Sequence, residues 1–282
     1  MTTKPNACKD CKRSDIPIKP FRTDFVCRPC YEALHFKKFK QYFYQSMNKK
    51  DHAVVFIIND HTITFEYTMK LINMAIDEEK RKRVQVYFIE VVVIDKDEIK
   101  DLPFHLYERM IISKSKDMNI ESTKKIIFLD GSNTTMKSSR ILTSITQGDV
   151  ITVPSIGRWS YKYDIQKEDS EIKYQLTVSR PIDFTEDEVL EYMQSDKKIE
   201  RIENDCLEKR CQQFLDKLMV EFDHTANTII ATAQRVVEED DYHKCKCCLK
   251  PFKPFLNDCE DGLCRTCHSL DIYQTIESEY PF

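Results

Sequence analysis

The sequence predicts a three-layer α/β protein, with a parallel sheet covered by helices on both faces and a small four-cysteine metal module at each end. Three features of the 282-residue chain lead to this prediction. Strand-like and helix-like segments alternate through residues 51–182, residues 183–243 have a helical pattern, and residues 1–50 and 244–282 each carry paired Cys-x-x-Cys motifs. We expect these four ranges to be the structural units of the chain.

The N-terminal range contains two Cys-x-x-Cys pairs with fifteen residues between them. Two thiolates separated by two residues can bind one metal ion from a single tight turn, and two such turns complete the tetrahedral four-sulfur shell of structural Zn²⁺. A spacer of this length is typical of zinc ribbons. The pattern therefore predicts a zinc site. Its ligands would be Cys8, Cys11, Cys27 and Cys30.

The C-terminal range repeats this pattern, again with a fifteen-residue spacer. Lys-Pro-Phe occurs inside both spacers, at residues 19–21 and 250–252, and the second pair of each set reads Cys-Arg-x-Cys. The repetition predicts a second zinc site of the same kind. Its ligands would be Cys245, Cys248, Cys264 and Cys267.

Uses of the cysteines other than zinc binding are disulfide formation and iron–sulfur ligation. Disulfides need an oxidising compartment, and the opening Met-Thr-Thr-Lys-Pro-Asn contains no apolar signal segment, so we expect a cytoplasmic protein with reduced thiols. Four-thiolate iron–sulfur ligation fits the same spacing and stays an alternative at both sites. Among the remaining cysteines, Cys206 and Cys211 have the pattern of buried small residues. Cys247 and Cys259 are spare or alternative ligands.

The charge of the chain is unevenly distributed. The net charge is −4, but residues 1–50 carry twelve Lys/Arg against four Asp/Glu, which gives +8 there and −12 in the rest. Overall charge therefore gives no reason to expect nucleic-acid binding. A basic module on an acidic body, however, indicates a local nucleic-acid-binding surface. No apolar run approaches the ~18 residues that a membrane span requires, so we expect no membrane partner.

The basic charge is concentrated just after the first metal motif, where residues 31–44 have the spacing of a helix. Lys37, Lys38 and Lys40 would project from this helix and, together with Arg28, contact RNA phosphates. The alternative is an ordinary solvated face of an amphipathic helix whose aromatic residues pack on the zinc ribbon.

The central range alternates between the two kinds of element. Segments rich in β-branched and other apolar residues predict strands at 53–58, 84–94, 125–129, 151–153 and 174–179. Apolar residues at helical spacing predict helices at 64–81, 104–115 and 134–145. Farther on, Thr185 is expected to cap a helix with an acidic first turn, and helical spacing continues through 206–222 and 226–237.

The loop after the first strand, residues 59–64, is expected at the carboxyl end of the sheet, where ligands bind in such folds. A backbone cradle for phosphate needs glycines, but the loop reads Asn-Asp-His-Thr-Ile-Thr, and the chain has no Gly-Lys-Ser/Thr motif. We therefore expect Asp60 to cap the loop and His61 to lie on the surface. ATP binding and a catalytic residue are not expected.

Several short stretches, in this order and spacing, resemble the cytoplasmic tRNA 2-thiolation proteins of the ATP-pyrophosphatase (PP-loop) superfamily. The chain is most similar to the non-catalytic partner subunits, the cytoplasmic tRNA 2-thiolation protein 2 family. The stretches that carry the resemblance are Cys-Arg-Pro-Cys-Tyr at 27–31, His-Phe-Lys-Lys-Phe at 35–39, Leu-Asp-Gly-Ser-Asn-Thr at 129–134, Val-Ser-Arg-Pro-Ile-Asp at 178–183, Glu-Val-Leu-Glu-Tyr at 188–192, Gln-Phe-Leu-Asp-Lys-Leu at 213–218 and Leu-Cys-Arg-Thr-Cys at 263–267.

The resemblance implies a degenerate PP-loop domain and a heterodimer with the catalytic thiolation subunit. That pair adenylates the wobble uridine of certain tRNAs and replaces its 2-oxygen with sulfur from a thiocarboxylated ubiquitin-related carrier protein. The family's phosphate loop reads Ser-Gly-Gly-x-Asp-Ser, and both glycines are missing at residues 59–64 of this chain. The implied role is therefore that of a pseudo-enzyme subunit that shapes the complex and helps to hold the tRNA.

Some alternatives stay open at this point. Arg180 could contact RNA or the partner subunit, or form a structural ion pair with a nearby carboxylate. The chain could itself be an adenylating or sulfur-transferring enzyme that uses Cys206, Cys211 or Cys259. It could also be a zinc-ribbon nucleic-acid-binding adaptor unrelated to thiolation.

Overall fold

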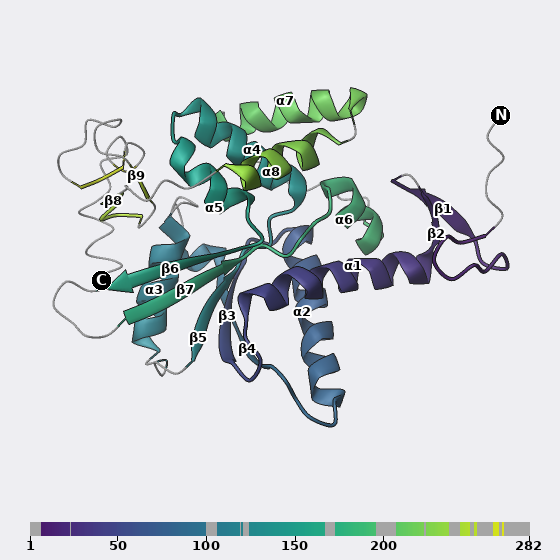
Figure 1. Ribbon diagram of the computed structural model, residues 1–282, viewed down its shortest axis with the longest axis horizontal. Helices are drawn as coiled ribbons and strands as arrows, with labels where there is room; N and C mark the ends of the chain where they lie inside the picture. Colours follow the sequence, from purple (N-terminus) through teal and green to yellow (C-terminus); the bar gives the residue numbers. More distant parts are fainter. Residues whose placement is uncertain are drawn as a thin grey trace.

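The computed structural model describes residues 7–22, 24–99, 106–118, 120, 124–166, 173–195, 207–222, 224–236, 243–248, 251–252, 262–264 and 267. A five-stranded sheet forms its centre, with the strand order β4-β3-β5-β7-β6 (Figure 1). Four neighbouring strands are parallel: β4 (Phe88–Asp95), β3 (His52–Asn59), β5 (Lys125–Leu129) and β7 (Lys173–Ser179). The edge strand β6 (Ser160–Gln166) is antiparallel to β7. The predicted α/β class is confirmed.

Alternate residues of the central strands enter two separate cores, which is why these strands are apolar throughout. On one face, Val55 and Ile57 of β3 pack with residues of α1 (Arg28–Phe43) and α2 (Ile63–Arg81). On the other face, Val54 and Phe56 pack with α3 (Tyr107–Asp117). Helices on both faces of the sheet complete the three predicted layers.

Four further helices gather beyond the carboxyl ends of the strands (Figure 1). They are α4 (Thr134–Thr146), α5 (Val153–Gly157), α7 (Leu207–Glu221) and α8 (Thr225–Arg235). A small core that includes Ile141, Val153 and Ile230 joins α4, α5 and α8. The short helix α6 (Glu186–Met193) is capped by Thr185 and has an acidic first turn, as predicted, and Thr185 also forms a capping box with Glu188.

The predicted strand at 151–153 is wrong. Residues Val150–Thr152 form a 3-10 turn (η4) that leads directly into α5. Pro154 explains the difference, because its fixed φ and missing N–H suit the first turn of a helix. The strand that follows, β6, was not predicted from the sequence.

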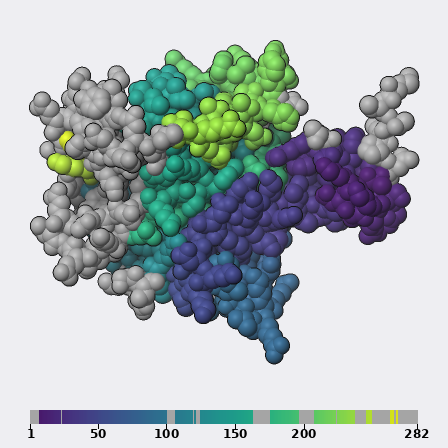
Figure 2. Space-filling model, in the orientation of Figure 1, coloured from purple at the N-terminus to yellow at the C-terminus, as the bar shows by residue number. Residues whose placement is uncertain are grey.

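The N-terminal module projects from the body (Figure 2). Strands β1 (Ile18–Phe21) and β2 (Asp24–Cys27) form an antiparallel hairpin, and α1 runs from this hairpin back to the sheet. A second small hairpin, β8 (His243–Lys244) with β9 (Pro251–Phe252), belongs to the C-terminal module. No helix in the described part of the chain is long and apolar enough to cross a membrane.

Candidate functional site

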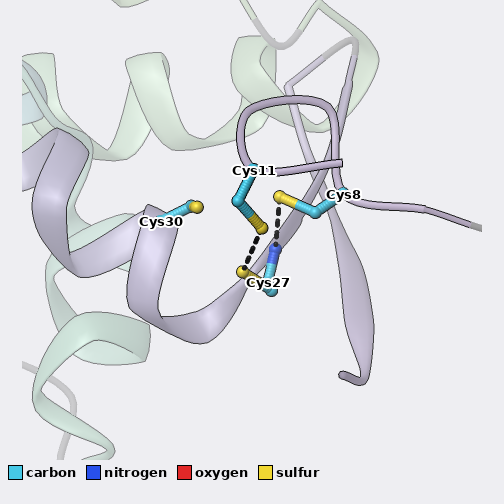
Figure 3. Close-up of side chains that lie close together, drawn as sticks. All are labelled: Cys8, Cys11, Cys27 and Cys30. Atoms are coloured by element: carbon cyan, nitrogen blue, oxygen red, sulfur yellow. Dashed lines mark hydrogen bonds between the residues drawn. The ribbon is translucent and has the colours of Figure 1, made fainter. Parts of the chain in front are cut away.

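The structure brings the four N-terminal cysteines together around one point (Figure 3). Cys8 and Cys11 lie on a tight turn, after which Lys12 adopts a φ of 61° and its N–H bonds to the carbonyl of Cys8. The β1–β2 hairpin places Cys27 opposite this turn, and Cys30 follows in the first turn of α1. The four sulfur atoms lie within 4.8 Å of one another.

Hydrogen bonding and burial act differently on these thiols. The Cys8 sulfur accepts the backbone N–H of Cys27 at 3.3 Å, and bonding from the backbone of Cys11 is the main cause that lowers the pKa of Cys8 to about 6. Burial raises the pKa of Cys30 to about 12. Four thiolates this close repel one another, so their joint ionisation requires a bound cation.

The four C-terminal cysteines converge in the same way, and all are buried. The Cys245 sulfur accepts the backbone N–H groups of Cys248 and Cys264, at 3.5 and 3.2 Å. Hydrogen bonding from the Cys248 thiol is the main cause that lowers the pKa of Cys245. Such N–H···S bonds support metal-binding thiolates from the second shell of a site.

Two contacts join the C-terminal module to α3. The buried guanidinium of Arg109 donates to the carbonyls of Lys246 and Cys247, at 2.9 and 3.3 Å. Leu106 packs among the cysteines, which include the buried fifth thiol of Cys247. Cys259 and Cys206 lie outside the described residues, whereas Cys211 is buried in α7, as expected.

Sulfur spacing tests which metal group fits. A tetrahedral ion with Zn–S bonds of about 2.3 Å places its sulfur atoms about 3.8 Å apart. The observed separations are 3.6 Å for Cys11–Cys27 and 3.7 Å for Cys248–Cys264. A four-iron cluster inserts iron and sulfide between its thiolates and so needs wider spacing. These two separations match a single tetrahedral ion, and all the sulfur atoms of each group lie within 4.8 Å of one another.

The basic residues of α1 are mostly paired with acidic groups. The ammonium of Lys38 lies 2.9 Å from a carboxylate oxygen of Asp183, and that of Lys40 lies 2.6 Å from one of Glu78. Lys37 is exposed and forms no hydrogen bond or ion pair with a described residue. The aromatic residues Tyr31, Phe39 and Phe43 are fully buried.

The remaining basic candidates are also engaged. Arg28 pairs with Glu32 at 2.6 Å and donates to the carbonyls of Glu191 and Tyr192. Arg180 is 4% exposed and pairs with Asp130 at 2.9 Å, the structural ion pair that its sequence context allowed. Of the five candidate RNA contacts, only Lys37 is without a partner in the described part of the chain.

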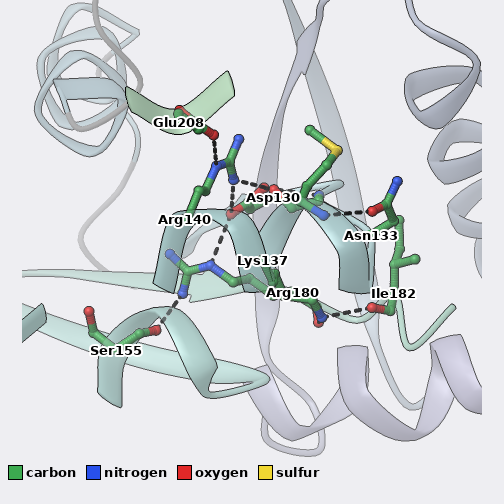
Figure 4. Close-up of polar contacts among 10 residues, drawn as sticks. Asp130, Asn133, Lys137, Arg140, Ser155, Arg180, Ile182 and Glu208 are labelled. Carbon is green, nitrogen blue, oxygen red and sulfur yellow. Dashed lines mark hydrogen bonds and ion pairs between the residues drawn. The ribbon is translucent and has the colours of Figure 1, made fainter. Parts of the chain in front are cut away.

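A buried polar network surrounds Asp130 at the carboxyl end of β5 (Figure 4). Burial would raise the pKa of this carboxyl, but Arg140 and Arg180 outweigh it and lower the pKa to about 2. Arg140 also reaches Glu208 of α7, and Arg180 donates to the carbonyl of Ser155 in α5. The network therefore connects the carboxyl end of the central strand β5 to helices α4, α5 and α7.

Lys137 of α4 is a member of this region that sequence reasoning missed. Its side chain is fully buried, donates to the carbonyl of Ile182 at 2.7 Å, and lies 4.0 Å from the centre of the Trp159 ring. Burial lowers its pKa to about 7. A lysine in the first turns of a helix gives no sequence signal for such burial, because most helical lysines are solvated.

The loop at 59–64 lies where the sequence predicted, between β3 and α2, and two of its backbone N–H groups bond to side chains of the loop itself. The N–H of His61 bonds to the side chain of Asn59, at 3.0 Å, and that of Thr62 bonds to Asp60, at 3.2 Å. Thr62 caps α2 by accepting the N–H of Phe65. Asp60 thus caps the loop, and His61 is exposed, as expected.

Acidic groups face this loop as well. His61 lies 3.2 Å from a carboxylate oxygen of Asp95, whose pKa is lowered chiefly by the backbone N–H of Asp97. An anion at this place would lie beside the Asp60 and Asp95 carboxylates. These two carboxylates would repel a phosphate group.

Gly131, in the loop after β5, makes a close contact between elements. A Cβ at this position would lie 2.8 Å from the Thr68 hydroxyl oxygen of α2. The φ of Gly131 is not positive, so the backbone conformation does not require glycine here. Space between the loop and α2 is the reason for glycine here.

Comparison with known proteins identifies a solved structure with a similar fold. No protein-family model matches the sequence. No curated protein sequence matches it either. A solved structure, the U34-tRNA thiolase NcsA from Methanococcus maripaludis with its [4Fe-4S] cluster, is similar over 95% of this chain and 96% of that chain, with a TM-score of 0.58 and 13% sequence identity. The chain therefore shares the fold of that thiolase.

Proposed function

We propose that this chain is a non-catalytic subunit of a complex that replaces the 2-oxygen of the tRNA wobble uridine with sulfur. In this proposal it acts in the cytoplasm, pairs with the catalytic thiolation subunit and helps to hold tRNA. The sulfur comes from a thiocarboxylated ubiquitin-related carrier protein. The fold that the chain shares with a U34-tRNA thiolase supports the reaction class.

The non-catalytic role rests on one observation, the closed loop at 59–64. In a phosphate loop, backbone N–H groups must be free to bind the anion. Here the N–H groups of His61, Thr62 and Phe65 are used by side chains of the loop itself. Opening the loop for ATP would break these bonds and leave Asp60 beside the phosphates.

We further propose that both four-cysteine groups hold zinc in a structural role. The sulfur spacings fit one tetrahedral ion, and the N-terminal ion would fix the β1–β2 hairpin at the start of α1. A structural zinc site supplies much of the folding free energy of a small module. The [4Fe-4S] cluster belongs to the solved thiolase, and its identity is not transferred to this chain.

The proposal is tested by the 2-thiouridine content of bulk tRNA, measured by nucleoside mass spectrometry in cells depleted of the protein. We expect the thio group to be lost and to be restored by the intact chain. The double variant Asp60→Ser, His61→Asn should restore it equally, because serine keeps a capping oxygen and asparagine tolerates positive φ.

Two results would contradict parts of the proposal. Unchanged 2-thiouridine after depletion would exclude the thiolation role. Failure of the loop variant to restore it, with the protein folded and present at normal level, would show that the loop takes part in catalysis. ATP–pyrophosphate exchange by the purified chain would lead to the same conclusion.

A further inference from the structure

The sheet ends in two unlike edge strands, β4 and β6 (Figure 1). Among the described strands, β4 pairs only with β3 and β6 pairs only with β7. The sequence of β6 contains Lys162 and Asp164, and charges of this kind protect an edge strand from pairing with other chains. The sequence of β4 is Phe-Ile-Glu-Val-Val-Val-Ile-Asp, which lacks this protection over Val91–Ile94.

The geometry of β4 also suits the addition of another strand. Its eight residues stay in continuous register with His52–Asn59 of β3, and the strand contains no proline or lysine. Edge strands of natural proteins are usually shortened, bulged or charged in a way that prevents pairing. About half of the backbone N–H and C=O groups of an edge strand point away from its one neighbour. In β4 these groups form a row along an unbroken apolar strand.

Side chains of β4 are exposed where those of the neighbouring strand are buried. Val93 is 44% exposed, whereas Ile57, its register partner in β3, is 2% exposed. Phe88 is 37% exposed and lies on the other face of the strand, because side chains alternate between the two faces. Apolar surface is therefore exposed on both faces of this edge, where a further strand would cover it.

The two ends of β4 carry opposite charge. Residues 80–83, which lead from α2 towards the start of β4, are all Lys or Arg and all exposed. Residues 95–98, which lead from β4 into the 3-10 turn η2 (Lys96–Ile99), contain three carboxylates and one lysine. The side chains of Arg83 and Asp97 form no ion pair with a described residue.

These opposite charges cannot neutralise each other within one chain. A strand of this length spans about 26 Å. At physiological ionic strength, the interaction of exposed charges is screened beyond about 8 Å. The two ends therefore attract oppositely charged groups of another molecule independently of each other.

A second copy of this chain supplies such groups when its β4 strand pairs antiparallel with the first. A two-fold axis near Val92 places the basic start of one strand beside the acidic end of the other, twice in the same interface. The same axis sets Val91–Ile94 of both copies side by side and keeps the two Glu90 carboxylates from facing each other. Parallel pairing would instead place like charges together.

We propose that two copies of this chain pair antiparallel at β4 and join their five-stranded sheets into one continuous sheet. Main-chain hydrogen bonds and the buried apolar side chains provide the affinity, and the charges at the two ends set the orientation. Self-pairing goes beyond the proposed thiolation function. Together, the two proposals place two copies of this chain in the thiolation complex.

The mass of the purified, metal-loaded full-length chain tests this proposal. Sedimentation equilibrium over a wide range of concentrations should show reversible association to twice the monomer mass. Val93→Lys should weaken the dimer at least tenfold, because the ammonium would lie among the apolar side chains of the interface. Circular dichroism and metal content establish that the variant is folded.

Val220→Lys is the matched control, because it makes the same change at a valine that is 83% exposed on α7. It should dimerise as the unaltered chain does. A monomer at all concentrations, or equal dimer stability in the two lysine variants, would overturn the proposal. Loss of the dimer in Val220→Lys alone would also overturn it, by locating the interface on α7.

Exchange of the charges tests the antiparallel arrangement without changing the apolar surface. Arg83→Asp and Asp97→Arg, both at exposed positions, should each weaken the dimer several-fold at low salt. The double variant should recover most of the lost affinity, because each changed end meets the other changed end in the second copy. Absence of this recovery would overturn the antiparallel arrangement.

The same variants separate a second copy from the other candidate occupant of β4, the catalytic subunit of the proposed function. If the chain stays monomeric and Val93→Lys abolishes its binding to that subunit, β4 belongs to the heterodimer and self-pairing is overturned. The dimer is measured on this chain alone, so its failure is distinguishable from failure of the thiolation role. A dimer that dissociates in Val93→Lys, with unchanged 2-thiouridine after depletion, would keep self-pairing and exclude the proposed function.

Discussion

Lys137 shows how one buried side chain can make stability depend on pH. Its pKa is lowered to about 7 by burial, whereas a lysine in an unfolded chain has a pKa of about 10.4. Between these values the unfolded state binds more protons than the folded state. The free energy of unfolding therefore rises as pH increases from 7 towards 10.

This gives a prediction for Lys137→Met. Relative to this variant, the unaltered protein should gain about 2–3 kcal/mol of stability between pH 7 and pH 9. Urea unfolding followed by circular dichroism at both pH values measures the difference, and groups common to both proteins cancel. Lys80→Met, an exposed control, should show no such trend. Parallel pH profiles for the unaltered protein and Lys137→Met would mean that Lys137 titrates normally.

His35 of α1 is a second buried titratable group at the residue scale. Its ring stacks on Phe184 at 3.6 Å, and its Nδ1 lies 2.7 Å from the Tyr67 hydroxyl. Burial lowers its pKa to about 3. The ring is therefore neutral at physiological pH and serves as a packing element between α1, α2 and the segment before α6.

At the scale of elements, the two four-cysteine groups are joined to the body differently. The N-terminal group is partly exposed and lies at the start of α1, whereas the C-terminal group is buried and the residues between its first two cysteines accept hydrogen bonds from Arg109 of α3. Loss of the N-terminal ion should therefore have a more local effect than loss of the C-terminal ion.

We predict that Cys11→Ser and Cys245→Ser each lose one zinc ion per chain, measured by plasma mass spectrometry. Hydrogen exchange should rise in β1, β2 and the first turn of α1 for the former, and should extend into α3 for the latter. Cys211→Ser, which changes a buried cysteine away from both groups, should retain both ions. Iron in place of zinc, or unchanged metal content in Cys11→Ser, would contradict the proposed sites.

At the scale of the whole molecule, α6 holds the N-terminal module against the body. Arg22 pairs with Glu188 at 2.9 Å, and Lys19 pairs with Glu191 at 2.6 Å. The Tyr31 hydroxyl also donates to the Glu188 carbonyl. Part of the positive charge of the first fifty residues is therefore paired with acidic residues of α6. The charge asymmetry of the sequence alone had indicated a nucleic-acid partner for this charge.

The double variant Glu188→Gln, Glu191→Gln should loosen this contact. Partly exposed ion pairs contribute about 0–1 kcal/mol each, so global stability should change little while hydrogen exchange in β1 and β2 increases. High salt should produce the same change in the unaltered protein and little further change in the variant. Unchanged exchange in both cases would show that packing alone holds the module.

Local patterns in the sequence predicted much of this fold. Features that depend on contacts between residues distant in sequence were harder to predict. The continuous apolar run of β3 and the helical spacing of apolar residues in α2 were sufficient to predict these two elements, because burial on both faces and helical periodicity are local patterns. The strand β6 was missed, since an edge strand with the sequence Ser-Tyr-Lys-Tyr-Asp-Ile-Gln carries little apolar signal.

The same distinction between local patterns and long-range contacts applies to the candidate site. Cysteine spacing located both metal groups, because their ligands are close in sequence. The partners of Lys38 and Arg180 lie 145 and 50 residues away, so no local pattern could show that these cations were already paired.

The contact between the N-terminal module and α6 has a consequence for biosynthesis. All four ligands of the first metal group are present once Cys30 has been made, but the module meets Glu188 only after another 158 residues (31–188) have been translated. The nascent chain can therefore load its first ion long before it can dock the module. The metal supply and the rate of translation would determine when the N-terminal module becomes resistant to proteases. The second metal group can form only after Cys267 has been translated.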